Sequence, residues 1–165
     1  MQHLKLLGGQ TPEELWWLTN STIPGLLLLI ILPRWKHTRV LTLIAPVFMA
    51  LVYTLGLISL MIYPEKEPDP DANFVSLEGV MAIFKDEAGV FVGWVHYIVF
   101  DALVARWVVF DSVTLKASTL THLFIVIPCV FFTIMAGPMG FLLYMILRNF
   151  ISTSKSSSVD KSKNS

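Results

Sequence analysis

Four long apolar stretches constrain the fold of this chain more than any other feature of its sequence. Each is near or above the roughly 20 residues that a helix needs to cross the hydrocarbon core of a bilayer. Because lipid offers the backbone no hydrogen-bond partners, such stretches form helices. The sequence therefore predicts an all-α integral membrane protein, a four-helix bundle over residues 15–148. The predicted spans are Leu15–Pro33, Val40–Tyr63, Val90–Phe110 and Leu120–Leu147.

The composition also indicates a membrane protein and leaves little chain for a soluble domain. Hydrophobic residues make up 55% of the chain and charged residues 15%, whereas about a quarter of the residues in soluble proteins are charged. The polar remainder comprises an N-terminal segment at residues 1–14, a linker at Pro64–Gly89 and a Ser/Lys-rich tail at residues 149–165. We expect the tail to be disordered, because it has nothing apolar to bury.

Two local patterns refine this picture. Within the linker, apolar residues recur at helical spacing from Phe74 to Phe84, which predicts a short amphipathic helix at the membrane interface with Ser76 as its N-cap. Proline and glycine mark two positions inside the spans. Pro24-Gly25 is predicted to kink the first span or to begin its deep part, and the GPMG quartet at Gly137–Gly140 is predicted to be a kinked packing point.

Several classes of function are disfavoured. The formal net charge is zero and the basic residues are scattered, so no nucleic-acid partner is expected. Cys129 is the only cysteine, which excludes an intrachain disulfide, and no Cys/His spacing resembles a zinc site. We expect neither a metal nor a redox cofactor.

No transit peptide or cleavage pattern is seen, so the first span is expected to be retained. Basic residues fall on both sides of the predicted bundle, which leaves the orientation open.

The third span is unusual because it contains three ionisable residues. An ionised side chain at mid-bilayer costs a few kcal/mol, so His96, Asp101 and Arg106 are expected to face the interior, to pair, or to lie near a boundary. Asp101 falls near the middle, while Arg106 is close enough to the far side to extend its guanidinium into the headgroups. His96 and Asp101 stand about 140° apart on a helix, so they flank one face without stacking on each other.

Two interpretations of these residues remain open. In the structural one, Asp101 is protonated or pairs with Arg106, His96 or His122 and holds the helices together. In the functional one, desolvation keeps Asp101 protonated near neutral pH so that it acts as a general acid, with His96 as the base or hydrogen-bond partner. Trp94 shares a helical stripe with Asp101 and would form part of a pocket wall.

Longer motifs place the chain near a known family. The pieces PGLLLLIILPRW, SLEGVMAIF, GWVHYIVFDALVARW and GPMGFLLYMILR occur in this order between Leu15 and Arg148. In these motifs the chain resembles the abscisic-acid-deficient four-like family of small integral membrane proteins. The resemblance covers most of the chain.

The resemblance implies both an activity and a location. Plant members of the family are plastid membrane proteins required to make neoxanthin from violaxanthin, a step that opens a carotenoid epoxide and removes a proton to leave an allene. By position, the family pattern falls on residues of the third span, and Ala102 departs from it where a bulkier residue is expected. The resemblance thus implies an isomerase, or an accessory factor, acting on an epoxy-carotenoid or related isoprenoid without a cofactor. The implied catalytic residues are His96 and Asp101, and the implied substrate-binding residues are Trp94, Tyr97, Arg106 and Trp107.

Two other functions compete with this one. In a noncatalytic membrane scaffold or complex subunit, Asp101 and Arg106 would serve helix assembly and the Gly137/Gly140 face would contact a partner in a homo- or hetero-oligomer. A small transporter ranks third, because the sequence shows no internal repeat. For every alternative the expected partners include membrane lipids, and for the first also a hydrophobic isoprenoid ligand.

Overall fold

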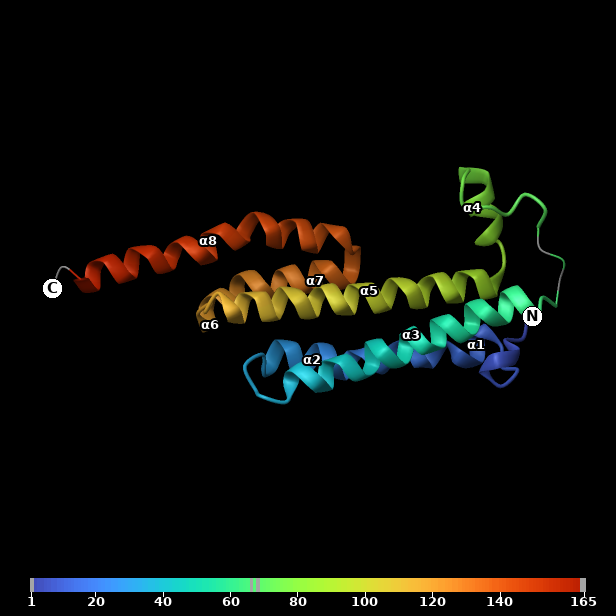
Figure 1. Ribbon diagram of the computed structural model, residues 1–165, viewed down its shortest axis with the longest axis horizontal. Coiled ribbons are helices and arrows are strands. Elements are labelled where there is room, and N and C mark those ends of the chain that lie inside the picture. Colours follow the sequence, from blue (N-terminus) through green and yellow to red (C-terminus); the bar gives the residue numbers. More distant parts are fainter. Residues whose placement is uncertain (1, 66, 68, 164–165) are drawn as a thin grey trace. The chain divides into compact units, whose positions relative to one another are not determined.

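The computed structural model describes residues 2–65, 67 and 69–163, with side chains described as far as Ile151. Over these residues the regular structure is helical, apart from one isolated bridge between Leu4 and Gln10 (Figure 1). In chain order the elements are η1 (Lys5–Leu7), α1 (Pro12–Leu15), η2 (Trp16–Thr22), α2 (Ile23–Ile31), α3 (Thr38–Ile62), α4 (Leu77–Ile83), α5 (Glu87–Thr114), α6 (Thr119–Thr121), η3 (His122–Val126), α7 (Ile127–Ala136) and α8 (Pro138–Lys163).

Four helical stretches are long and apolar enough to cross a membrane, which confirms the predicted all-α, multi-pass architecture. Their exposed surface is rich in large apolar side chains, such as Ile31, Val47 and Phe124, as expected where helices face lipid rather than water. The four stretches are Pro12–Ile31, Thr38–Ile62, Glu87–Thr114 and Thr119–Ala136.

The chain divides into two compact units. The first unit contains Met1–Ile23 and Ile44–Phe100, and the second contains Pro24–Leu43 and Asp101–Ser165. Helix α5 therefore begins in the first unit and ends in the second.

The N-terminal segment of the first unit folds against α3. Leu4 is fully buried, and the backbone N–H of Leu6 donates to the hydroxyl of Ser59. A capping box then starts α1. The hydroxyl of Thr11 accepts from the backbone N–H of Glu14, and the Glu14 carboxylate accepts from the backbone N–H of Thr11. This exchange satisfies two of the donors that a helix N-terminus leaves without partners.

The first span combines 3₁₀- and α-helix, and its proline lies where the two meet. Pro24 has no N–H to donate four residues back, to the carbonyl of Asn20. The N–H of Ile23 donates to that carbonyl instead, which is the tighter 3₁₀ spacing. Helix α2 begins at Ile23, next to the Pro24-Gly25 step where the sequence predicted a kink or the start of the deep helix.

The acidic linker of the first unit is held by a few polar contacts. The Glu65 carboxylate accepts from the backbone N–H of His3 at 3.0 Å. Lys85 lies 3.2 Å from the Asp69 carboxylate, which also accepts from the backbone N–H of Asp71. These donors lower the pKa of Asp69 from its ordinary value, with the Asp71 N–H as the larger cause and Lys85 as the second.

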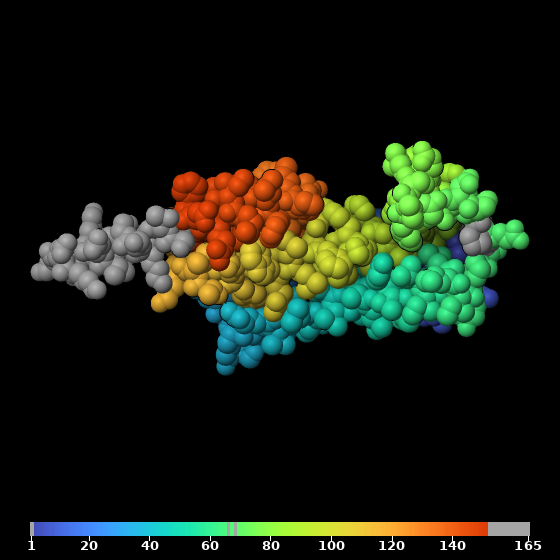
Figure 2. All heavy atoms as spheres, turned by 45° about the horizontal axis from the view of Figure 1, so that its top comes forward, coloured from blue at the N-terminus to red at the C-terminus, as the bar shows by residue number. Residues whose placement is uncertain are grey.

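The predicted linker helix is present as α4. Ser76 caps it as predicted, because its hydroxyl accepts from the backbone N–H of Gly79 at 3.0 Å. Leu77 and Met81 are largely exposed. Figures 1 and 2 show α4 and its flanking residues, in green, projecting from the start of α5. That these apolar side chains enter a membrane interface stays a prediction.

The second unit contains a helical hairpin where the sequence predicted one continuous span. Helix α7 ends at Ala136, and α8 begins at Pro138 and packs back along α7 (Figure 1). Gly137, between them, has φ 52° and ψ −108°, a conformation that residues with a Cβ rarely adopt. A Cβ on Gly140 would lie 2.1 Å from the backbone nitrogen of Thr133, so the two helices approach at backbone distance. The prediction of a single span over Leu120–Leu147 is therefore wrong.

The hairpin also changes the expected role of the glycines. Gly140 faces α7 of its own chain, so that side is not free for a partner. Helix α8 is described as far as Lys163. That the Ser/Lys-rich tail from residue 149 is disordered stays a prediction. Residues 164 and 165 lie outside the described residues.

The core of the second unit is apolar and includes the lone cysteine. Cys129 is fully buried in a cluster that α2, α5, α7 and α8 all supply, consistent with a packing role. The helix that leads into α7 relaxes to π-helical spacing at η3. Pro128 has no N–H to donate, and the N–H of Ile127 bonds five residues back to His122.

Candidate functional site

Helix α5 carries all six residues that the sequence analysis singled out. Trp94, His96 and Tyr97 belong to the part of α5 in the first unit, and Asp101, Arg106 and Trp107 to the part in the second. The two predicted catalytic residues, His96 and Asp101, therefore belong to different units.

Aromatic rings gather around α5 in the first unit. The ring of Trp94 stacks on Trp16 at 6.1 Å with 20° between the planes, and on Tyr97 at 5.3 Å with 29°. Trp16 also contacts Phe91 at 6.5 Å. Trp94 keeps 45% of its surface exposed and Trp16 44%, so the stack has an open side.

His96 lies between two further rings of the same unit. Its imidazole is 5.3 Å from the ring of Tyr53 and 4.7 Å from that of Phe100. The His96 side chain is exposed. It therefore does not face the protein interior, which was one of the three positions predicted for it. The ring contacts form two groups, one around Trp94 and one around His96, and we call both groups together the aromatic cluster: Trp16, Phe91, Trp94 and Tyr97, and Tyr53, His96 and Phe100.

The spacing of residues along α5 explains part of the aromatic cluster, and packing of η2 and α3 against α5 explains the rest. Positions 91, 94, 97 and 100 of α5 recur at intervals of three, and position 96 precedes position 100 by four, so these residues lie on neighbouring rows of one helix. The rings of Trp16 and Tyr53 come from η2 and α3, and no local pattern pairs them with α5. Trp94, His96 and Tyr97 were predicted as site residues from the sequence, whereas Trp16, Tyr53, Phe91 and Phe100 were not.

In the second unit, Asp101 is buried, with 8% of its surface exposed, as predicted for a carboxyl group deep in a span. Two of its three proposed partners make other contacts. Arg106 donates to the backbone carbonyl of Arg39 at 2.8 Å, and its guanidinium lies 4.9 Å from the ring of Phe110. His122 is buried and hydrogen-bonds the carbonyl of Ile30 at 3.2 Å.

Trp107 packs within the second unit. Its ring centroid lies 5.7 Å from Phe141 and 5.7 Å from Tyr144, the latter in an edge-on arrangement at 89°. Both partners belong to α8, so Trp107 helps to hold the hairpin onto α5. Its predicted role in binding a substrate stays a prediction.

The strongest polar cluster of the second unit was missed by the sequence analysis. The Asp111 carboxylate accepts from the hydroxyl of Tyr144 at 2.7 Å, and from two nitrogens of Arg148 at 2.6 and 3.0 Å. The Arg148 contact is bidentate, the strongest geometry for this pair. Tyr144 is fully buried. The signal was present, since Tyr144 and Arg148 stand four residues apart on α8, but Asp111 lies just past the predicted end of the third span.

The polar groups do not form a metal centre in the described part of the chain. Among those residues no group of three or more His, Cys, Asp or Glu side chains converges closely enough to hold an ion. The fold and the residues of α5 define a class: a small multi-pass helical membrane protein whose central span carries aromatic rings, one histidine and one buried carboxyl group.

Comparison with known families places the chain within this class. The chain belongs to the ABA DEFICIENT 4-like family, whose model matches residues 15–144. This confirms the resemblance drawn from the motifs. The match contains every predicted site residue and also Asp111 and Tyr144, and it ends before Arg148. No curated protein and no solved structure matches the chain.

Proposed function

We propose that this protein acts within the bilayer on a hydrophobic isoprenoid, an epoxy-carotenoid, as an isomerase that needs no redox cofactor. The observation that carries the proposal is the aromatic cluster of the first unit, on a membrane-spanning helix. In this cluster Trp16, Trp94 and Tyr97 stack with an open side, and His96 lies between Tyr53 and Phe100. Membership of the ABA DEFICIENT 4-like family supports the same substrate class.

The aromatic cluster suits a long conjugated hydrocarbon. A polyene is flat and apolar, so it gains contact area against the faces of offset-stacked rings such as Trp16, Trp94 and Tyr97. Because the open side of the stack belongs to helices that cross the membrane, the substrate would reach it from the lipid without entering water.

The reaction requires one base and one acid. A base removes a proton from the carbon next to the epoxide, the C–O bond breaks as the new double bond of the allene forms, and the released oxygen takes a proton from an acid. Atoms and electrons balance, so the step is an isomerisation. A neutral imidazole at His96 is the candidate base, and the carboxyl group of Asp101 is the candidate acid. Each role is a proposal for that residue.

The test is a pigment profile of cells that accumulate violaxanthin and express this protein. We expect a neoxanthin-like isomer with the unmodified chain. His96→Ala and Asp101→Asn should each lower its rate of formation by roughly 10²–10⁴-fold, the usual contribution of a general acid or base. Matched controls are His37→Ala and Asp71→Asn, which remove exposed groups of the same kind outside α5. Full activity of His96→Ala or Asp101→Asn, in protein shown to be in the membrane, would contradict the assignment.

A noncatalytic scaffold is the second candidate, because other ionisable groups of α5 already serve internal assembly. Arg106 binds the Arg39 carbonyl, and Asp111 binds Tyr144 and Arg148. If the pigment profile is unchanged by the unmodified chain in several isoprenoid-producing hosts, this second function is favoured over the first.

A further inference from the structure

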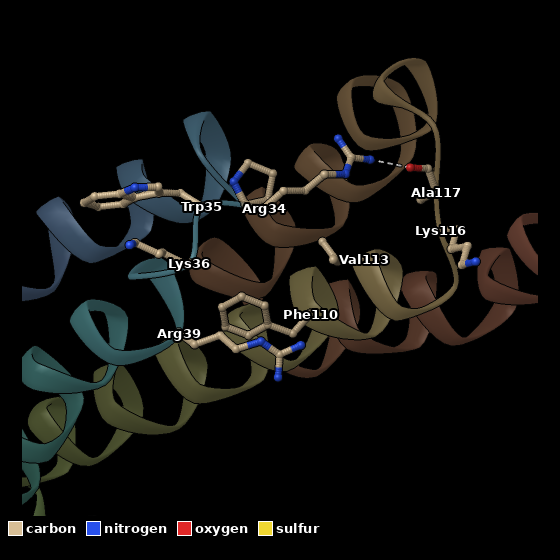
Figure 3. Close-up of a pocket in the computed structure, with 9 residues that line it drawn as sticks. Arg34, Trp35, Lys36, Arg39, Phe110, Val113, Lys116 and Ala117 are labelled. Carbon is tan, nitrogen blue, oxygen red and sulfur yellow. Dashed lines mark hydrogen bonds between the residues drawn. The ribbon is translucent and has the colours of Figure 1, made fainter.

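A basic pocket lies in the second unit. It is formed by the loop after α2, the start of α3 and the C-terminal end of α5, and its volume is about 460 Å³ (Figure 3). This volume is within the range of small-molecule sites. The pocket is lined by Pro33, Arg34, Trp35, Lys36, Arg39, Phe110, Val113, Lys116 and Ala117.

A hydrogen bond and a cation–π contact connect the segments that form the pocket. Arg34 donates to the backbone carbonyl of Ala117, which joins the loop after α2 to the loop after α5. The guanidinium of Arg39 lies 5.0 Å from the ring of Phe110. Figure 3 shows Arg34 reaching towards Ala117, with Val113 on the wall between this contact and Phe110.

The charge of the pocket is unbalanced. Four of its lining residues are basic and none is acidic: Arg34, Lys36, Arg39 and Lys116. Three ion pairs of the described residues are His3–Glu65, Lys85–Asp69 and Arg148–Asp111, and these three do not include a pocket cation. Asp111, the acidic residue nearest to Lys116 along the chain, already accepts three hydrogen bonds from Tyr144 and Arg148.

The pocket lies at the ends of helices that are long enough to cross a membrane, which is where lipid headgroups are expected. Its loops connect the ends of helices that are long enough to cross the membrane. Trp35, on its rim, is of the residue type that prefers the headgroup level. The pocket also has an apolar wall, to which Pro33, Phe110 and Val113 contribute, so one molecule with a charged head and an apolar body would satisfy both surfaces.

We propose that this pocket binds the phosphate group of an anionic lipid headgroup. The guanidinium group of an arginine donates two parallel hydrogen bonds to two phosphate oxygens, and the ammonium group of a lysine adds a compact positive charge near the same anion. Basic pockets between membrane helices bind anionic headgroups in this way. The proposal does not depend on the isomerase function, because the pocket and the aromatic cluster share no residue.

The test uses the full-length protein in lipid nanodiscs and native mass spectrometry of the lipid that it retains. The discs contain phosphatidylcholine alone or phosphatidylcholine mixed with phosphatidylglycerol. We expect retained phosphatidylglycerol with the unmodified chain and at least a roughly tenfold loss in Lys36→Gln/Lys116→Gln, since each basic residue near an anionic headgroup contributes about a factor of five. The matched control is Lys5→Gln/Lys85→Gln, which removes the same charge from the first unit.

The outcomes separate the sources of the phosphate. Displacement of the lipid by inorganic phosphate at low concentration, or binding of phosphate in discs of phosphatidylcholine alone, would support a phosphate site that also takes soluble phosphates. Retention of phosphatidylglycerol that phosphate does not displace would support a lipid site. Equal losses in the two double variants, or equal retention of phosphatidylcholine and phosphatidylglycerol, would overturn the proposal.

Discussion

Tyr144 shows what a single polar atom contributes in an apolar setting. Its ring is fully buried, its hydroxyl donates to Asp111 at 2.7 Å, and Trp107 packs edge-on against it. A hydroxyl without a partner would be costly at this depth. The carboxylate of Asp111 supplies the partner and is held in place by the bidentate contact with Arg148.

We predict that Tyr144→Phe destabilises the protein although it keeps the ring. The variant removes one hydrogen bond to a charged group, so the free energy of unfolding should fall by about 1.5–3 kcal/mol. The measurement is reversible unfolding in mixed micelles by added denaturing detergent.

The control for this variant is Tyr63→Phe. Tyr63 is exposed, and its ring, which lies 5.4 Å from the Lys5 ammonium, is kept in phenylalanine. Its unfolding free energy should not change. Equal effects of the two substitutions would show that the hydroxyl of Tyr144 contributes nothing specific.

At the scale of elements, the hairpin of α7 and α8 is the main departure from prediction. Glycine and proline together permit either a kinked helix or a reversal, and the GPMG letters do not distinguish these two outcomes. The structure resolves the choice because Gly137 has a positive φ and Gly140 meets α7 at backbone distance.

We predict that Gly140→Ala loosens this hairpin. The new Cβ would lie 2.1 Å from Thr133 N and 2.5 Å from the Cys129 carbonyl oxygen, so the helices must separate, at a cost of about 1–3 kcal/mol. The same unfolding measurement detects the loss.

Gly25→Ala is the matched control in another helix of the same unit. There the nearest atom to a new Cβ is the Cα of Thr42 at 3.7 Å, an ordinary contact. Alanine is the better helix former, so this variant should be neutral or gain up to about 1 kcal/mol. A gain of stability in Gly140→Ala as well would contradict the close packing of α7 on α8.

At the scale of the whole molecule, charge is divided unequally between the two units. The second unit contains nine of the twelve basic residues of the chain and three of the twelve acidic ones. The hairpin contributes to this division. Because α8 runs back along α7, Arg148 binds Asp111 near the C-terminal end of α5. Arg34 binds the carbonyl of Ala117 at the same end. A single fourth span would have placed Arg148 at the opposite end.

The positive-inside rule now gives one orientation, where the sequence left two. We predict that the loops after α2 and α5 and the residues around Arg148 face the cytoplasmic side, and that the acidic linker faces the other side. Labelling of single cysteines by a membrane-impermeant reagent in sealed vesicles, with Cys129 replaced by alanine, tests this. His37→Cys, Thr119→Cys and Phe150→Cys should react from one side and Val75→Cys from the other. Reaction of Phe150→Cys together with Val75→Cys would contradict the hairpin.

The sequence by itself determined the helical class, the approximate positions of four spans, the Ser76 cap and the family of the protein. These features are local. In lipid a backbone must satisfy its own hydrogen bonds, so the length of an apolar run is enough to predict a helix. The motifs that carry the family resemblance are likewise continuous stretches of chain.

Only the tertiary structure decided which side chains meet. Asp111 joins Tyr144 and Arg148 across more than 30 residues, and Arg34 joins Ala117 across 83. Helix packing depends on the shapes of two surfaces at once, and neither surface can be read from its own stretch of sequence. For this reason the residues of α5 were predicted as a set, whereas the aromatic partners of Trp94, the anchor of Asp111 and the basic pocket emerged from the fold.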